Sequence, residues 1–258
     1  MEKETIVVAI LAKDKAHCLP FYLQCIYNQT FPKKKTHLYI RTNDNNDNTE
    51  SILQEFIKTH GVEYASVVLD TTNISESLKK YGHHEWNNER FTILGKIRQE
   101  SIEYAKTLDA HYFVADCDNF ITPDTLNRMF SLRSLGVIAP LLVSRTAYSN
   151  YHYDVDKNGY YQESPFYMDL LLKRINGIVS VKVVHCTYFI HSKHLVDITY
   201  NDGTSRYEYV IFSDALRKKN IPQYLDNTSE YGFLVFSDNT ESFEVDKSAF
   251  ASLIERKF

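Results

Sequence analysis

The 258-residue sequence predicts an α/β fold in which a mostly parallel, Rossmann-like sheet is flanked by helices. Two observations carry this prediction. Through the first 143 residues, short apolar runs alternate with segments that have helical periodicity. The first of these runs, Ile6–Ala12, is also continuous and rich in β-branched residues, as in a parallel strand that is covered on both faces. With only 8 glycines, the chain offers few flexible linkers, which favours one compact unit.

The first elements follow one another as strand, helix, strand and helix. Ile6–Ala12 is a continuous apolar run and is predicted to be a buried strand. Leu19–Asn28 carries apolar residues at helical spacing, and His37–Thr42 has the character of a second strand. Asn48 or Thr49 is then suited to cap the next helix, which carries an apolar face.

The same alternation continues to residue 143. Val62–Leu69 is predicted to be the third strand, and Arg90–Leu108 a long amphipathic helix. His111–Ala115 is a short apolar strand that ends directly on an aspartate. Asp124–Leu132 has a proline in its first turn and is predicted to be helical, and Val137–Val143 is predicted to be a strand.

The second half of the chain is less regular. Residues 144–170 are polar and aromatic, which predicts long loops with a hairpin at residues 156–159. Val181–Ile190 is predicted to be a strand, and Tyr207–Lys219 and Ala249–Phe258 are predicted to be helices. Tyrosines gather between residues 148 and 167, where they suit a sugar- or peptide-binding rim, although a biased coding sequence explains them equally well.

Composition and charge exclude several classes of protein. The net charge of -4 and the pI near 6.2 argue against a nucleic-acid-binding protein. The first apolar run is too short for a signal peptide or a membrane span, and we expect no transmembrane segment. The four cysteines form no Cys-x-x-Cys pair, so we expect reduced core thiols rather than zinc ligands. These features favour the cytoplasm or another reducing compartment.

Polar residues follow three of the predicted strands, at residues 12–14, 42–44 and 116–118. In a parallel sheet these strand ends meet at one edge, where ligands bind. Asp116 and Asp118 of Asp-Cys-Asp-Asn suit a hard cation that also binds phosphate oxygens, such as Mn²⁺ or Mg²⁺. Asp154 and Asp156 match the same two-aspartate pattern but lie in a predicted loop, so position and not the motif favours the first pair.

Other phosphate-binding and nucleophile motifs are missing from the sequence. The turn after the first strand has no Gly-x-Gly-x-x-Gly, and no Gly-x-x-x-x-Gly-Lys-Ser/Thr occurs. Gly-x-Ser-x-Gly is also absent, which argues against an α/β-hydrolase.

Several segments, in order along nearly the whole chain, resemble the N-terminal glycosyltransferase domain of procollagen galactosyltransferases, which has a GT-A fold. They lie at residues 10–20, 43–49, 96–99, 116–119, 144–150, 159–161, 184–187 and 230–234. The resemblance implies a GT-A-like single domain over residues 1–258. Its nucleotide- and metal-binding half would end near residue 143, and a smaller acceptor-side half would span residues 144–258. Full-length members of that family add a second glycosyltransferase domain, a secretory signal and a retention tail, none of which we expect here.

The resemblance also implies ligands and site residues. The donor would be a UDP-sugar, UDP-galactose or UDP-glucose, and the cofactor Mn²⁺. The acceptor would be hydroxylysine of a collagen-like protein or another glycan hydroxyl. Asp116 and Asp118 match the metal-binding motif, and His185 is a candidate third ligand. The residues expected near the nucleotide-sugar are Ala12, Thr42, Asn43, Asp44, Trp86, Lys96, Asp116 and Cys117. The residues expected near the acceptor are Arg145, Tyr148 and Asn150.

Inverting transfer requires a general base that deprotonates the acceptor hydroxyl. Glu208, which aligns with an acidic pair of the family, is the first choice, and Asp214 the second. A glutamate in the first turn of a helix also suits the helix dipole without any catalytic role. Arg98 lies near Lys96 on the same helix, and one of the two could counter the diphosphate charge.

Two alternatives from other classes stay open. A nucleotidyltransferase also uses paired aspartates and metal, but its usual glycine- and arginine-rich loop does not follow the first strand. A non-catalytic carbohydrate- or collagen-binding relative is the other, because Tyr207 replaces the first residue of the family's acidic pair.

Overall fold

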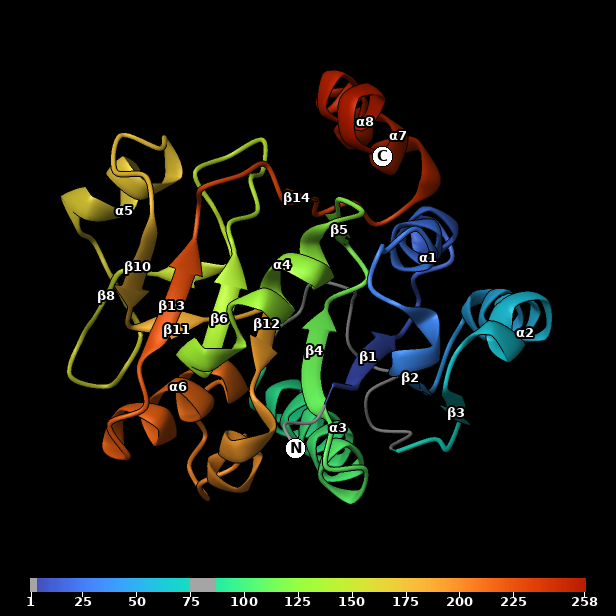
Figure 1. Ribbon diagram of the computed structural model, residues 1–258, viewed down its shortest axis with the longest axis horizontal. Helices are drawn as coiled ribbons and strands as arrows, with labels where there is room; N and C mark the ends of the chain where they lie inside the picture. The colour runs from blue at the N-terminus through green and yellow to red at the C-terminus, as the bar shows by residue number, and fades with distance from the viewer. Residues whose placement is uncertain (1–3, 75–86) are drawn as a thin grey trace.

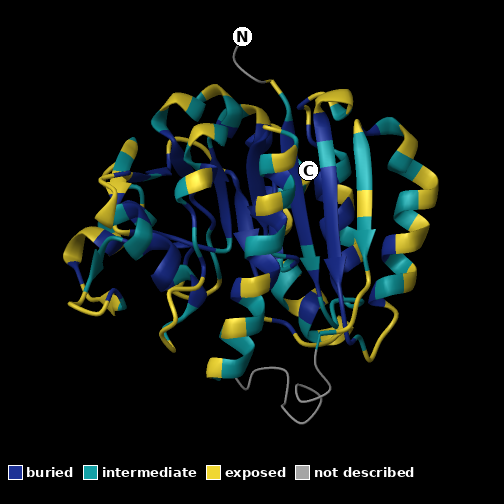
Figure 2. Ribbon diagram, turned by 90° about the horizontal axis from the view of Figure 1, so that it is seen from below, coloured by how far each residue is buried: buried dark blue, intermediate teal, exposed yellow. Residues whose placement is uncertain are grey.

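The computed structural model describes residues 4–74 and 87–258, and confirms the α/β fold class. One eight-stranded sheet runs through the molecule in the order β10-β13-β6-β12-β4-β1-β2-β3, and it contains strands from both halves of the chain (Figure 1). Helices cover both of its faces, and the buried residues concentrate in the strands between them (Figure 2). Within the described ranges, no helix is long and apolar enough to cross a membrane.

The parallel half of the sheet is close to the prediction from periodicity. Its strands are β1 (Ile6–Ala12), β2 (Thr36–Thr42), β3 (Ser66–Asp70) and β4 (His111–Ala115). β1 pairs in parallel with β2 and with β4, and β2 pairs in parallel with β3. The third strand begins later than predicted, because residues 61–63 form a 3₁₀ turn that leaves Val62 exposed.

The other half of the sheet is mixed. Its strands are β6 (Val137–Pro140), β10 (Ile178–Val181), β12 (Thr187–Ile190) and β13 (Gln223–Asp226). β12 lies between β4 and β6 and is antiparallel to both, while β13 is parallel to β6 and antiparallel to β10. The antiparallel strand β12 therefore interrupts the parallel order at the centre of the sheet.

The single strand predicted over Val181–Ile190 is wrong. The chain instead forms the end of β10, the short β11 (Val183–Val184) and then β12. Cys186, between β11 and β12, has a φ of 61°, a left-handed conformation that a strand cannot contain. This break places His185 and Cys186 in a turn beside the end of β4, since the backbone N–H of Asp116 donates to the carbonyl of Cys186 at 2.9 Å.

Three two-stranded pairs stand outside the main sheet. They are β5 (Asn119–Ile121) with β14 (Gly232–Leu234), β7 (Tyr151–His152) with β11, and β8 (Asp154–Val155) with β9 (Tyr161–Gln162). The pair β8–β9 encloses the hairpin predicted at residues 156–159. The pair β5–β14 ties the loop after β4 to the C-terminal part of the chain.

The helices divide between two layers. They are α1 (Leu19–Tyr27), α2 (Thr49–His60), α3 (Asn88–Thr107), α4 (Thr125–Ser131), α5 (Pro165–Leu171), α6 (Glu208–Lys218), α7 (Thr240–Ser248) and α8 (Ala251–Lys257). Ile6, Val8 and Ile10 of β1 pack in one core with residues of α1, α2 and α4, whereas Val7 and Ala9 pack in a second core with residues of α3 and α6. This alternation is the side-chain period of a strand buried on both faces.

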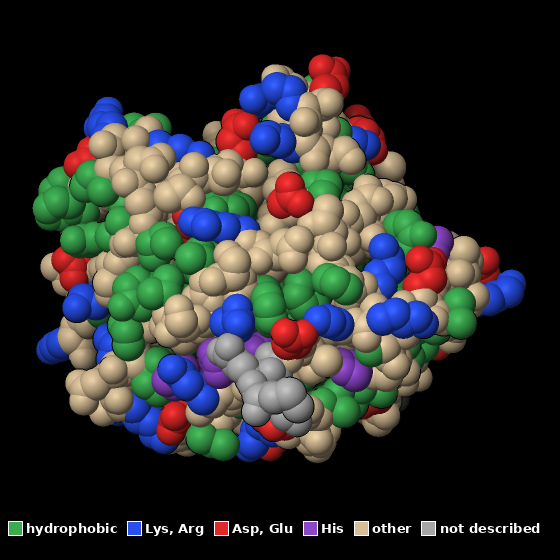
Figure 3. Space-filling model, in the orientation of Figure 1, with side chains coloured by type: hydrophobic (Ala, Val, Ile, Leu, Met, Phe, Trp, Pro, Cys, Tyr) green, Lys and Arg blue, Asp and Glu red, His purple; other side chains and the backbone are tan. Residues whose placement is uncertain are grey.

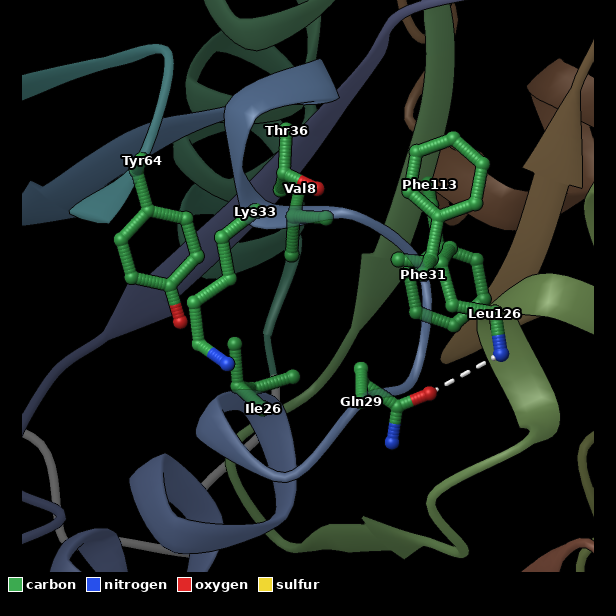
Figure 4. Close-up of a pocket in the computed structure, with 9 residues that line it drawn as sticks. All are labelled: Val8, Ile26, Gln29, Phe31, Lys33, Thr36, Tyr64, Phe113 and Leu126. Carbon is green, nitrogen blue, oxygen red and sulfur yellow. Dashed lines mark hydrogen bonds between the residues drawn. The ribbon is translucent and has the colours of Figure 1, made fainter.

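Gln29 joins the end of α1 to the start of α4. Its side chain is buried, and its Nε2 donates to the carbonyls of Cys25 and Thr122 at 3.0 and 2.9 Å. Its Oε1 accepts the backbone N–H of Leu126 at 2.9 Å, the contact drawn in Figure 4 beside a small internal cavity. Gln29 therefore satisfies the carbonyl of Cys25 and the N–H of Leu126, and it adds a second bond to the carbonyl of Thr122, which also accepts the N–H of Thr125.

We expect Gln29→Leu to lower the free energy of unfolding by about 2–4 kcal/mol, because the new side chain fills similar space but leaves buried backbone groups unpaired. Urea unfolding followed by circular dichroism measures this change. Gln24→Leu is the control, because Gln24 is exposed on α1 and its amide donates to the side chain of Asn28 at 2.8 Å. A shift of equal size in both variants would contradict the bridging role.

Candidate active site

Asp116 and Asp118 lie on a short loop that is fixed by hydrogen bonds within its own turn and to the segments after β14 and in β12. The loop follows β4, and the backbone N–H of Asn119 donates to the carbonyl of Asp116 at 2.8 Å, closing a tight turn. The carbonyl of Asp118 accepts the N–H of Val235 at 3.0 Å. The side-chain amide of Asn119 is buried and donates to Thr187 Oγ1 at 2.8 Å. The two carboxylates are thus presented by a fixed backbone at the carboxyl end of a central strand.

This loop opens onto a cleft with a volume of about 530 Å³. The cleft is bounded by the ends of β1 and β2, the first half of α3, the start of α6 and the segment 234–238. Eight of the predicted site residues line it, namely Ala12, Asn43, Asp116, Cys117, Asp118, Tyr148, His185 and Glu208. Basic and acidic side chains are interspersed over the face of the molecule in Figure 3.

A buried ion network connects Asp116 to Glu208. The Nη2 of Arg98 donates to both carboxylate oxygens of Asp116, at 2.8 and 3.0 Å. On its other side, the Nε of Arg98 lies 3.6 Å from Glu208 Oε1. Arg98 and Glu208 are almost fully buried, with side chains 4% and 5% exposed. Arg98 therefore holds the two acidic groups of the cleft in fixed positions relative to each other.

The environment of Glu208 suits a proton acceptor. Burial raises the pKa of Glu208 to about 7, with the Arg98 charge lowering it and the Asp116 charge raising it further. Its Oε2 is buried and has no hydrogen-bond partner in the described part of the chain. A carboxylate with this pKa exchanges its proton near neutral pH, which is the range in which a general base is most effective.

Asp118 has a different counter-ion. The Nζ of Lys15, in the loop between β1 and α1, lies 2.8 Å from Asp118 Oδ2. Burial alone would lower the pKa of Lys15, but the Asp118 charge and its hydrogen bond raise it well above its ordinary value. Lys15 is therefore a cation at physiological pH. Burial also raises the pKa of Asp116, which the Arg98 charge partly offsets.

The structure does not bring His185, the candidate third ligand, into one metal-binding cluster with Asp116 and Asp118. Across residues 4–74 and 87–258, no group of three or more His, Cys, Asp or Glu side chains is arranged to hold a metal ion. The Nδ1 of His185 lies 2.9 Å from Cys186 Sγ and 3.5 Å from the hydroxyl of Tyr148. Its ring packs against those of His152 and Tyr209. His185 thus belongs to an aromatic cluster, which is the physical reason it does not join the aspartates.

In the acidic turn after β2, some residues line the cleft and others have a structural role. Asn43 lines the cleft, whereas Thr42 and Asp44 are buried and are not among its lining residues. Thr42 Oγ1 accepts from the amide of Asn45 at 2.6 Å, and Asp44 Oδ2 accepts the N–H of Ile74 at 3.1 Å. Nucleotide contact by Asn43 stays a prediction, while Thr42 and Asp44 shape the turn that presents it.

Three further predicted residues lie outside the cleft lining, and a fourth is outside the described residues. Asn150 is fully buried and its side chain bonds the backbone of Pro140, Leu142 and Thr187, so it supports the scaffold, and its contact with an acceptor stays a prediction. Arg145 pairs with Asp246 on the surface and does not line the cleft. Lys96 is 64% exposed, faces Glu100 on α3 and lies outside the cleft lining. Trp86 lies outside the described residues.

Sequence reasoning missed other residues of the cleft wall. The rings of Phe91 on α3 and Tyr207 stack with centroids 3.8 Å apart, and both line the cleft. Phe236, in the segment after β14, is 51% exposed and contacts the ring of Tyr148. The position of Lys15 just beyond the end of β1 could have indicated its site, because strand ends meet there. The aromatic contacts depend on long-range packing and had no comparable signal.

Residues 3–253 match the family model described as "Glycosyltransferase family 25, N-terminal domain". The chain belongs to this family. The predicted resemblance is therefore confirmed, whereas the metal-binding role of Asp-Cys-Asp-Asn stays a prediction.

Curated relatives include active and inactive members. The chain is 34% identical to mouse procollagen galactosyltransferase 2 over 192 residues, covering 73% of this chain and 31% of that protein. It is 30% identical to the human protein of that name over 235 residues, covering 87% and 37%. It is also 33% identical to mouse inactive glycosyltransferase 25 family member 3, covering 72% and 32%. The chain thus spans about a third of the length of these relatives.

Solved structures with the same fold include complexes with nucleotide-sugars. TarS of S. aureus in complex with UDP-GlcNAc aligns with a TM-score of 0.58 at 15% identity, covering 92% of this chain and 61% of that one. A mannosyltransferase from Pyrobaculum calidifontis in complex with GDP-Man and Mn²⁺ aligns with a TM-score of 0.55 at 13% identity, covering 97% and 64%. These similarities confirm the GT-A fold.

Proposed function

We propose that this chain is a metal-dependent glycosyltransferase that moves a hexose from a UDP-sugar to a hydroxyl acceptor with inversion. Galactose is favoured over glucose, and hydroxylysine of a collagen-like protein is the favoured acceptor, because the relatives include procollagen galactosyltransferases. One observation carries the proposal. Asp116, Asp118 and Glu208 line the same cleft, and Glu208 has a pKa of about 7.

The donor side of the cleft fits a divalent cation. Asp116 and Asp118 supply hard carboxylate oxygens, and Mg²⁺ or Mn²⁺ at phosphate sites is commonly held by one or two carboxylates together with substrate phosphates. Two protein ligands are therefore sufficient without His185. Bound there, the metal would neutralise charge on the diphosphate leaving group. Asn43 and Ala12, at the ends of β2 and β1, line the same cleft, which supports a contact with the nucleotide.

Glu208 supplies the chemistry on the acceptor side. Its carboxylate takes the proton of the acceptor hydroxyl while that oxygen forms a bond to the anomeric carbon. The bond between the anomeric carbon and the diphosphate breaks, and UDP leaves with the electron pair. A single displacement of this kind inverts the configuration at the anomeric carbon.

Asp214, the second candidate for the base, is less suited to the role. It is paired with Arg206, Arg217 and Lys218, and it is not among the residues that line the cleft. Although burial would raise its pKa, the bonds from Lys218 and Arg206 lower it below the ordinary value. Its surroundings stabilise the charged form and occupy its oxygens, which favours Glu208.

A non-catalytic relative is the second candidate function. It is favoured by the pairing of each aspartate with a protein cation and by the relatives that are named inactive. Such a protein would bind a nucleotide-sugar or a glycan without releasing UDP. Membership of a glycosyltransferase family leaves the nucleotidyltransferase alternative without support.

Donor turnover distinguishes a transferase from a binding protein. We expect Mn²⁺-dependent UDP release from UDP-galactose, to a smaller extent from UDP-glucose, and faster release when a hydroxylysine-containing collagen peptide is added. Chelation of the metal with EDTA should stop the reaction, and GDP release from GDP-mannose serves as the control. Binding of UDP-galactose without UDP release, with and without the peptide, would support the non-catalytic candidate instead.

A further inference from the structure

The contact between Lys15 and Asp118 occupies a carboxylate oxygen that a metal would use. The Nζ of Lys15 lies 2.8 Å from Asp118 Oδ2, inside the cleft. The two side chains are 27% and 28% exposed, so the pair is open to exchange with solvent ions. An ammonium and a divalent cation cannot share the same oxygen closely, because like charges a few ångströms apart repel strongly.

The counter-ion of the other aspartate is held much more firmly. Arg98 makes two hydrogen bonds to Asp116, and its opposite edge faces Glu208. Its side chain is 4% exposed, so moving it away from these groups would leave a buried charge without compensation. Arg98 is therefore a fixed partner of Asp116. Lys15 is partly exposed, has a long flexible side chain, and contacts Asp118 through a single pair of atoms.

The backbone around Lys15 is anchored, so its side chain can move without the loop. The N–H of Lys15 donates to Thr49 Oγ1 at 2.7 Å, and its carbonyl accepts the N–H of Leu19 at 2.9 Å. The next residue is also tied, since the N–H of Ala16 donates to Asp47 Oδ2 at 2.9 Å. Reorientation of the ammonium then needs only rotation about the side-chain bonds of Lys15.

We propose that Lys15 is a displaceable counter-ion of Asp118, and that a divalent cation entering the cleft takes the place of its ammonium. The inference rests on the metal-binding role of Asp118 in the proposed function. In the nucleotide-free protein, Lys15 competes with the cation and weakens its binding. The negative diphosphate of a donor favours the exchange, because it offsets the additional positive charge. Lys15 in this way couples metal binding to donor binding.

The competition is tested by measuring the affinity of the nucleotide-free protein for Mn²⁺ in the wild type and in Lys15→Met. Methionine keeps much of the length of the lysine side chain but removes its charge. Electron paramagnetic resonance of free Mn²⁺ measures binding independently of turnover. We expect Lys15→Met to bind Mn²⁺ about tenfold more tightly than the wild type. Lys13→Met is the matched control. Lys13 lies in the same loop, lines the same cleft and is 32% exposed, but it pairs with Asp14. Its removal should change the affinity by less than about threefold.

Each outcome bears on a different statement. Equal Mn²⁺ affinity in Lys15→Met and wild type, or weaker binding in the variant, would overturn the counter-ion role. An equal gain in Lys13→Met and Lys15→Met would also overturn it, since the effect would then be that of net charge. A parallel titration with saturating UDP tests the proposed function separately. If neither the wild type nor Lys15→Met binds Mn²⁺ there, the metal site itself is wrong.

Discussion

Asp118→Asn is expected to lower Mn²⁺-dependent transfer by about a thousandfold or more, because the metal that stabilises the departing diphosphate loses its exposed carboxylate. The substitution keeps the shape of the side chain, and its partner Lys15 is partly exposed, so the fold should be unaffected. Steady-state UDP release, with circular dichroism to confirm folding, measures the effect.

Asp154→Asn is the matched control, because Asp154 belongs to the second Asp-x-Asp match but lies on the short strand β8, outside the cleft lining. It should retain activity within about twofold, as surface substitutions away from a site usually do. Full activity of Asp118→Asn would exclude the metal role of this residue. Asp116→Ala is a less clear test, because it removes the two hydrogen bonds that the buried Arg98 makes to Asp116, leaves Glu208 as its acidic neighbour, and should destabilise the protein by about 3–5 kcal/mol.

The parallel half of the fold could be predicted because its signal is local. Each strand from Ile6–Ala12 to His111–Ala115 is a short apolar run, and each following helix has its own periodicity. The convergence of the strand ends then follows from topology alone. Topology in this way predicts that Ala12, Asn43 and Asp116 share one edge of the sheet, and all three line the cleft.

The mixed half could not be predicted in the same way. Strands such as β13 (Gln223–Asp226) and β14 (Gly232–Leu234) have four and three residues, which is too short for a periodic pattern. The break between β11 and β12 depends on a left-handed Cys186, a residue type that gives no turn signal. Pairing of these segments is set by contacts between distant parts of the chain.

Residue type alone also does not distinguish a ligand-binding side chain from a structural one. Asn150 was expected to bind the acceptor, yet its amide bonds three backbone positions inside the protein. His185 was expected to bind metal, yet its turn directs it toward aromatic rings and Cys186. Both are polar residues in matching segments, and only the burial and the hydrogen-bond partners separate the two roles.

Glu208→Gln should lower kcat by about 10²- to 10⁴-fold, the range that general base catalysis contributes. Glutamine keeps the size of the side chain but cannot accept the proton of the acceptor hydroxyl. Asp116 still pairs with Arg98 in this variant, so the donor side of the cleft stays intact. The affinity for UDP in the presence of Mn²⁺ should therefore stay within about threefold of the wild type. Rapid-mix kinetics measures the loss of kcat, and UDP titration measures the affinity for the nucleotide.

The pH dependence gives an independent test of the same residue. Burial places the pKa of Glu208 at about 7, so the carboxylate is protonated and inactive below that pH and becomes a base above it. The value of kcat/KM in the wild type should rise tenfold per unit well below pH 7 and level off above it, because this ratio reports the free enzyme. Glu208→Gln should lose this rise, whereas Asp214→Asn, whose carboxylate is ion-paired outside the cleft, should keep it. A wild-type profile that is flat between pH 5.5 and pH 8.5, or an unchanged rise in Glu208→Gln, would assign the base to another group.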